Sequence, residues 1–181
     1  RQLTQLTDHE FITLASLVEE ETSLASEAPK IAGVFYNRLA KGMPLQTDPT
    51  LMYSPERVGK TPTPRERKDS TNPYNTYSSA GALPPGPICS PRVNALVAVL
   101  APERHDLLFF VARRDGQRGH VFSRTYKEHK AHVRAQLGGR DRLYLPGGRL
   151  GRIAAEDGAA GPWIRQWVEL QPAPAFRIAR L

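Results

Sequence analysis

The chain has 181 residues, of which 40% are hydrophobic, so its length and composition suit one ordinary folded domain and do not indicate disorder. Its formal net charge of +7 favours a polyanionic partner, but the basic residues are scattered and do not alternate with aromatic residues. We therefore expect no nucleic acid as a partner. The single cysteine, Cys89, excludes an internal disulfide, and its flanks indicate a small buried apolar residue.

The beginning of the chain predicts two helices in tandem. Residues 7–10, Thr-Asp-His-Glu, match a capping box and are followed by a helix to about Ser26. A second helix starts at Ser26 or Glu27, has Pro29 in its first turn, and ends where Gly42 suits a left-handed stop. The two helices together form an αα-hairpin.

The middle of the chain is irregular. Residues 43–90 are rich in Pro, Thr, Ser, Asn and Gly, and a loop of this length in a compact domain is most often functional. Within it, Asp48 and Pro49 predict the start of a short helix through Tyr53. Ser90 and Pro91 then predict a third long helix, whose expected apolar face carries Val93, Leu96, Val97 and Leu100.

A β-hairpin is predicted next, with strands at residues 107–112 and 120–123. Residues 125–128 form a second capping box, and the helix that follows runs to Leu137. From residue 140 the composition changes, with expected strands at 143–145 and 176–178. A short helix at 162–170 carries two tryptophans, which we interpret as core rather than as a sugar-stacking surface.

One acid in the first helix stands out. Glu19, Glu20 and Glu21 are consecutive, and such a run usually faces solvent, but at about 100° per residue Glu21 falls inside the apolar stripe with Leu17 and Val18. A carboxyl group turned toward a core is costly to ionise, so its pKa rises. An acid that stays protonated near neutral pH is what a glycosidase general acid requires.

Seven segments of the chain resemble, in order, the MltG/YceG-type family of endolytic murein transglycosylases. They are residues 14–22 (LASLVEEET), 31–39 (IAGVFYNRL), 42–50 (GMPLQTDPT), 74–77 (YNTY), 83–88 (LPPGPI), 110–112 (FVA) and 119–123 (GHVFS). The family's catalytic glutamate directly precedes the threonine of the first segment, which makes it Glu21 here.

The resemblance implies cleavage of the β-1,4 bond between N-acetylmuramic acid and N-acetylglucosamine inside a glycan strand, leaving a 1,6-anhydromuramyl end. Glu21 would act as general acid and then as base, because the C6 hydroxyl of the sugar replaces water as the nucleophile. No metal or organic cofactor is implied. The expected partners are peptidoglycan strands and, as further candidates, cell-wall synthesis proteins. The expected place is the extracytoplasmic face of the bacterial cytoplasmic membrane, with a membrane anchor upstream of this chain.

The matching segments also contain candidate substrate-binding residues, namely Gln46, Asp48, Asn75, Tyr77 and His120. Each has a structural alternative. Asp48 is more simply a helix N-cap, His120 a hydrogen-bonding residue of the hairpin, and the others partners of loop backbone groups. Glu19 is expected to be solvated.

The sequence thus predicts an α+β fold: a lysozyme-like helical core carrying the catalytic Glu21, a long groove-forming loop region and a β-hairpin. We place the catalytic domain at residues 1–138 and a C-terminal extension at 139–181. The alternatives are a hydrolytic muramidase that uses Glu21 and Asp48, a non-catalytic peptidoglycan-binding module, and a basic nucleic-acid binder.

Overall fold

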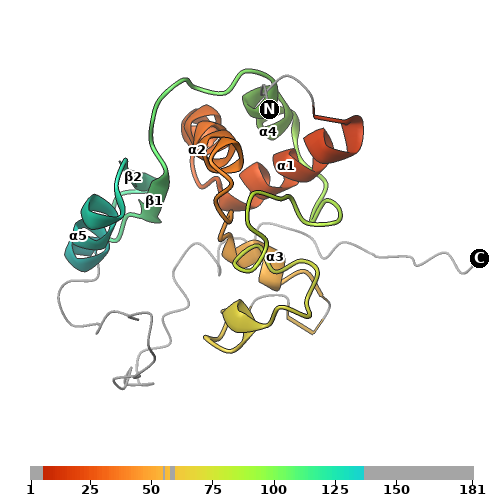
Figure 1. Cartoon of the computed structure of the whole chain (residues 1–181). Helices are drawn as coiled ribbons and strands as arrows, with labels where there is room; N and C mark the ends of the chain where they lie inside the picture. Colours follow the sequence, from red (N-terminus) through yellow and green to blue (C-terminus); the bar gives the residue numbers. More distant parts are fainter. Residues whose placement is uncertain (1–5, 55, 58–59, 137–181) are drawn as a thin grey trace, which may run out of the picture.

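The computed structural model of the protein describes residues 6–54, 56–57 and 60–136 (Figure 1). In this part, helices are combined with one two-stranded antiparallel sheet, which is the predicted α+β class. The order is α1 (Asp8–Glu21), η1 (Ala25–Glu27), α2 (Ala28–Ala40), α3 (Asp48–Leu51), η2 (Glu66–Lys68), α4 (Val93–Leu100), β1 (Phe109–Ala112), β2 (His120–Ser123) and α5 (Tyr126–Gln136). The likeness to a lysozyme core stays a prediction.

Helix α1 begins as the sequence predicts and ends earlier. The Thr7 hydroxyl accepts from the Glu10 backbone N–H, and the Glu10 carboxylate accepts from the Thr7 N–H at 2.8 Å, which confirms the capping box. The predicted end at Ser26 is wrong, because the backbone of Thr22 is extended and its hydroxyl donates to the Val18 carbonyl at 2.5 Å. This stop makes Glu21 the last residue of the helix.

Helix α2 follows the expectation closely. Pro29 lies in its first turn, and Gly42 beyond its end has a φ of 65°, the left-handed conformation that glycine adopts without strain. The short 3₁₀ turn η1 precedes it, so the regular helix starts at Ala28, slightly later than predicted.

The core lies where α1, α2 and α4 pack together (Figure 1). Its largest fully buried side chains come from the first two helices and from the loop after them, and include Leu14, Leu17, Ile31, Phe35 and Leu45. Full burial of side chains of this size contributes roughly 1.5–3 kcal/mol each. The core therefore fixes the C-terminal end of α1 against α2.

The face of α4 that packs inward is not the one expected. Of the predicted apolar face, Leu96 packs against the core, but Val93, Val97 and Leu100 are 71%, 53% and 72% exposed, so most of that prediction is wrong. Ala95 and Ala98 are buried instead. Because these side chains are small, the backbone of α4 can approach α1 and α2 closely.

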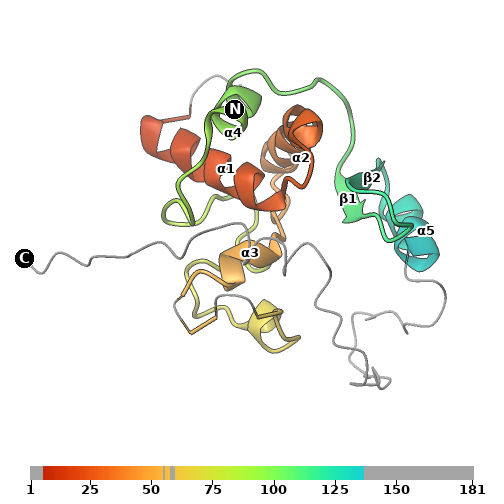
Figure 2. The ribbon, with the colours of Figure 1, turned by 180° about the vertical axis from the view of Figure 1, so that it is seen from behind.

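The hairpin and α5 lie together on the α2 side of the molecule in both views (Figures 1 and 2). The antiparallel register pairs Phe109 with Ser123 and Ala112 with His120, so the first strand is shorter than the predicted 107–112. Phe110 contacts Phe35 of α2 edge-to-face, with ring centroids 6.1 Å apart. The second capping box is confirmed where α5 starts, since the Glu128 N–H donates to the Thr125 hydroxyl at 3.2 Å.

The long irregular segment passes beneath the helices and also covers α1. Ser16 of that helix is fully buried beneath this segment, and its hydroxyl accepts from the Ile88 N–H at 3.0 Å. None of the helices in the described part of the chain is long and apolar enough to cross a membrane. The elements expected at 143–145, 162–170 and 176–178 lie outside the described residues.

Candidate functional site

Glu21, at the end of α1, is half-buried. Burial raises the pKa of its carboxyl group to about 7, and the negative charges of Asp48 and Glu20 act in the same direction. The Thr47 hydroxyl and the Arg38 guanidinium oppose the rise in pKa. The negative end of the α1 dipole further disfavours an ionised carboxylate at this position. Near neutral pH this group is therefore present in both protonated and ionised forms.

Arg38 provides the buried positive charge of the site. It is 7% exposed on α2 and donates to three backbone carbonyls, at 2.7 Å to Leu108, 2.8 Å to Leu45 and 3.2 Å to Pro44. Burial lowers the pKa of the guanidinium, and the nearby Glu21 carboxyl counteracts this. Arg38 thereby joins α2 to the start of the long loop and to the segment before β1.

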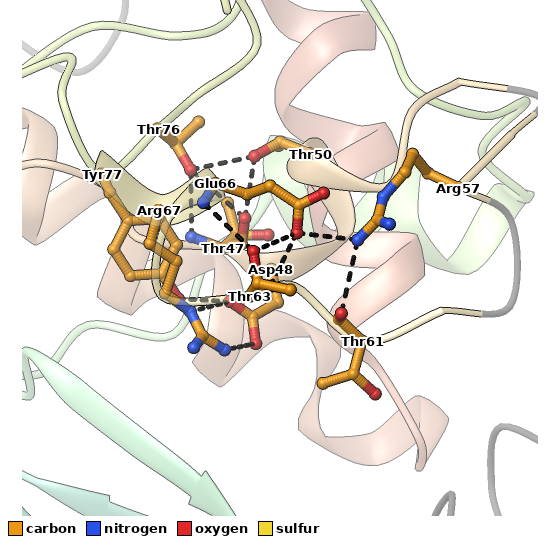
Figure 3. Close-up of polar contacts among 10 residues, drawn as sticks. All are labelled: Thr47, Asp48, Thr50, Arg57, Thr61, Thr63, Glu66, Arg67, Thr76 and Tyr77. Carbon is orange, nitrogen blue, oxygen red and sulfur yellow. Dashed lines mark hydrogen bonds and ion pairs between the residues drawn. The ribbon is translucent and has the colours of Figure 1, made fainter. Parts of the chain in front are cut away.

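Hydrogen bonds among threonines hold the start of α3 to Thr76 of the long loop (Figure 3). The Thr47 N–H donates to the Thr76 hydroxyl at 3.0 Å, and the Thr50 hydroxyl lies 3.1 Å from the same oxygen. The hydroxyl oxygen of Thr47 is itself buried and has no partner at good hydrogen-bond geometry in the described part of the chain. It nevertheless lies near enough to the Glu21 carboxyl to lower its pKa.

Asp48 is not a helix N-cap. The cap position of α3 is Thr47, which makes no side-chain capping bond, and Asp48 is the first helical residue. Its carboxylate turns away from the helix backbone toward the loop and pairs with Arg67, whose Nε and Nη2 donate to Oδ1 and Oδ2 at 3.0 and 2.7 Å. The Tyr77 hydroxyl also donates to Oδ1 (Figure 3). These donors hold the carboxylate toward the loop, because two charge-assisted bonds are stronger than a single capping bond to a backbone N–H.

Asn75 organises the loop that carries this arrangement. It is fully buried, and its amide nitrogen donates to the carbonyls of Asp69, Glu66 and Arg67 at 2.7, 3.1 and 3.3 Å. Its side-chain oxygen accepts from the Tyr77 N–H at 2.9 Å. Of the two roles considered for Asn75, the structure supports the partner of loop backbone groups.

The other two candidates, Gln46 and His120, have different environments. Gln46 is exposed, has a φ of 53°, and its side-chain oxygen accepts from Arg38 at 3.4 Å, so it borders the buried guanidinium. His120 on β2 is engaged by Glu27, with ring Nδ1 and Oε2 2.8 Å apart and its backbone N–H donating to Oε1 at 3.0 Å. The structure thus shows the hydrogen-bonding role of His120 at the hairpin.

The neighbours of Glu21 on α1 are also engaged. The Glu19 carboxylate accepts from Arg92 at 2.6 Å and its side chain is 14% exposed, so the expected solvated role is wrong. Cys89 is half-buried rather than buried, and its thiol donates to the Ser16 carbonyl at 3.5 Å. Burial raises the pKa of this thiol, as it does the pKa of the nearby Glu20. Among the described residues, no cluster of three His, Cys, Asp or Glu side chains is placed to hold a metal ion.

Sequence reasoning missed Arg38, Arg67, Thr47 and Thr76. A signal existed for Arg38, which follows Val34 and Phe35 by four and three residues and so lies within the apolar stripe of α2, as Glu21 does on α1. For Arg67, embedded in a run of mixed charges, no local signal singles it out, since its partner lies 19 residues away.

Comparisons with known proteins identify the family of this chain. The YceG-like family matches residues 1–135. An endolytic murein transglycosylase of Bacillus subtilis (strain 168) is 46% identical over 123 residues, which are 67% of this chain and 32% of that protein. One from Streptococcus pneumoniae serotype 2 is 36% identical over 127 residues, 68% of this chain and 22% of that protein.

Among solved structures, a yceG-like protein from Listeria monocytogenes is 40% identical, with a TM-score of 0.61 over 68% of this chain and 38% of that chain. The chain therefore spans about a third or less of the length of the two named relatives. The family match covers Glu21, Arg38, Asp48 and the loop between them. From this match and these relatives, the chain belongs to the YceG-like family.

Proposed function

We propose that this chain carries the catalytic site of an endolytic murein transglycosylase, with Glu21 as its acid and base. The observation that supports the proposal most directly is a half-buried carboxyl group whose pKa is about 7. Such a group donates a proton and takes one back at similar cost near neutral pH, which one residue serving both steps must do. The names of the relatives from Bacillus and Streptococcus supply the substrate.

In the proposed reaction, protonated Glu21 donates its proton to the glycosidic oxygen between N-acetylmuramic acid and N-acetylglucosamine. The bond from C1 to that oxygen breaks, and N-acetylglucosamine leaves with a free 4-hydroxyl group. The C6 hydroxyl of the muramyl sugar then attacks C1, and its proton passes to the Glu21 carboxylate. The acid is regenerated, no water is consumed, and the product ends in a 1,6-anhydro ring.

The less favoured alternative is a muramidase that hydrolyses the same bond. It needs a second carboxylate that activates water or attacks the sugar. Asp48 is the nearby acid from another element, but its oxygens already accept from Arg67 and Tyr77. The use of either oxygen as base or nucleophile would compete with the bonds that it already accepts.

The substrate also determines where such an enzyme works. Peptidoglycan lies outside the cytoplasmic membrane, so we propose that the full-length protein acts on the extracytoplasmic side, held by an anchor upstream of this chain. Cell-wall synthesis proteins are the partners we would test first for association with the full-length protein. We also propose that the catalytic domain comprises residues 1–138 and that residues 139–181 form a C-terminal extension.

The product identifies the reaction. Full-length protein incubated with purified glycan strands is expected to give muropeptides that end in anhydro-muramic acid, each lighter by one water than the hydrolysis product in mass spectrometry. Glu21→Gln is expected to fold and to lose activity by about 10²–10⁴-fold, because an amide neither donates nor accepts the proton. Reducing ends instead of anhydro ends, or a Glu21→Gln variant with more than about a tenth of the activity, would overturn the proposal.

A further inference from the structure

Arg67 connects two parts of the candidate site that the sequence leaves apart. It comes from η2 in the long loop, and its partner Asp48 begins α3. The guanidinium binds both carboxylate oxygens, at 3.0 and 2.7 Å, and lies 5.6 Å from the centre of the Tyr77 ring. Because two-bond pairing of this kind favours one orientation, the Asp48 side chain is held in a fixed position.

The backbone that carries Arg67 is itself fixed. The buried Asn75 amide donates to the Arg67 and Glu66 carbonyls. The Glu66 carboxylate accepts from the Thr63 N–H at 2.7 Å, and the Glu66 N–H donates to the Thr63 hydroxyl at 3.3 Å, and this reciprocal pair closes the turn that leads into η2 (Figure 3). Arg67 therefore reaches Asp48 from an ordered turn.

Several charged groups act on Glu21. Arg38 approaches from α2, Glu20 from the same helix, and Asp48 from α3. Glu20 lies beside Cys89, whereas Asp48 is tied to the loop by Arg67. A fixed negative charge from a separate element favours the protonated acid before cleavage. It also stabilises the positive charge that develops on the sugar ring when the glycosidic bond breaks.

We propose that Arg67 is a positioning residue of this site: it holds the Asp48 side chain in one orientation at the start of α3, the element that contacts the helix of Glu21, and Asp48 acts on Glu21 through its charge without transferring a proton. Neither residue has this role from the family match, and the proposal rests on the proposed function of Glu21. It predicts that Arg67 affects kcat only by positioning Asp48.

A double-mutant cycle tests that dependence on full-length protein. Asp48→Asn and Arg67→Gln are each expected to lower kcat by about ten- to a hundredfold with KM little changed. Together they are expected to cost no more than Asp48→Asn alone, because Arg67 then has no charge to hold. Arg67→Lys is expected to recover part of the loss. Additive losses, or losses confined to KM, would mean that Arg67 binds substrate directly and would overturn the proposal.

Arg57 offers a matched control on the same loop. Its side chain is 25% exposed against 28% for Arg67, and it forms a 2.7 Å ion pair with Glu66 that does not involve Asp48. Arg57→Gln is expected to keep kcat within about twofold, since a partly exposed pair contributes little. An equal loss in Arg57→Gln and Arg67→Gln would show that loop order alone matters, and the proposal would fail.

The charge of Asp48 can also be measured without activity. Carbon-13 NMR of the Glu21 side-chain carboxyl follows its titration directly, and Asp48→Asn is expected to lower the Glu21 pKa by about half a unit or more. An unmoved Glu21 titration in a protein that cleaves glycan would overturn this inference alone. A wild-type protein that cleaves nothing, with the NMR shift present, would instead overturn the proposed function.

Discussion

Three consecutive acids at the end of α1 have three different environments. Glu19 pairs with Arg92, Glu20 lies next to the Cys89 thiol, and Glu21 faces the start of α3. Each residue turns the side chain by about 100° around the helix, so neighbours in sequence meet different segments of the fold. Position on the helix therefore separates the candidate catalyst from two acids of identical chemistry.

The raised pKa of Glu21 has a consequence for stability. The pKa of the Glu21 carboxyl is about 7 in the folded protein and 4.5 when the group is unperturbed. The folded state therefore binds the proton more tightly, and it is progressively destabilised as the pH rises from 4.5 to 7. Glu21→Gln, which never ionises, is expected to match the wild type below pH 4.5. Above pH 7 it is expected to be more stable by about 1–3 kcal/mol. Urea unfolding across this pH range measures the difference.

Activity is expected to follow the same titration, with kcat/KM falling above about pH 7 as the acid form is lost. Glu20→Gln provides a comparison: burial also raises the pKa of Glu20, so its stability is expected to depend on pH too, but unlike Glu21→Gln it keeps the proposed acid and is expected to stay active. A stability difference between Glu21→Gln and the wild type that does not change with pH would contradict the raised pKa.

At the scale of elements, the long loop keeps its shape through side-chain hydrogen bonds more than through regular structure. Asn75→Ala is expected to destabilise the protein by about 2–3 kcal/mol, since it removes a buried side chain and leaves three part-buried carbonyls and one N–H without their partner. Ser78→Ala, which removes an exposed hydroxyl bonded to the Asn75 carbonyl, is expected to cost about 0.5 kcal/mol or less. Thermal unfolding of both variants provides the comparison, and equal costs would argue against a scaffolding role for Asn75.

Helix α2 approaches the segment before β1 so closely that one position excludes a side chain. A Cβ atom at Gly33 would lie 2.5 Å from the Glu103 carbonyl oxygen and 2.7 Å from His105 Nε2. Gly33→Ala is therefore expected to lower stability by about 1–3 kcal/mol even though alanine favours helices. The contrast is Gly42→Ala, which meets no atom within 4 Å and costs about 1 kcal/mol through its left-handed backbone. A stabilised Gly33→Ala variant in chemical denaturation would contradict the close approach.

On the scale of the whole molecule, one ionisable residue ties the hairpin to the joint between α1 and α2. Glu27 accepts from the His120 backbone N–H and contacts its ring, and its side chain is 19% exposed. Glu27→Ala is expected to cost about 1–3 kcal/mol and to speed amide exchange in the hairpin more than in α1. Glu103→Ala, which breaks the more exposed pair with Lys30, is expected to cost under about 1 kcal/mol. Uniform exchange changes across the domain would argue against a local attachment.

Local patterns in the sequence determined the elements and the identity of the main candidate. The capping boxes at Thr7 and Thr125, Pro29 in the first turn of α2, and the β-hairpin all depend on residues within a few positions of one another. Glu21 was found for the same reason, because its place in an apolar stripe is a property of one helix. Interactions of this range need no knowledge of the fold.

The tertiary structure decided what each element faces. Most of the apolar stripe predicted for α4 is exposed and Ser16 on α1 is buried, because helix packing and the covering loop select the faces. Asp48 likewise pairs with Arg67 across 19 residues in place of capping its own helix. Contacts between segments that are distant in sequence depend on the tertiary fold. Local patterns in a single sequence do not show which distant segments will meet.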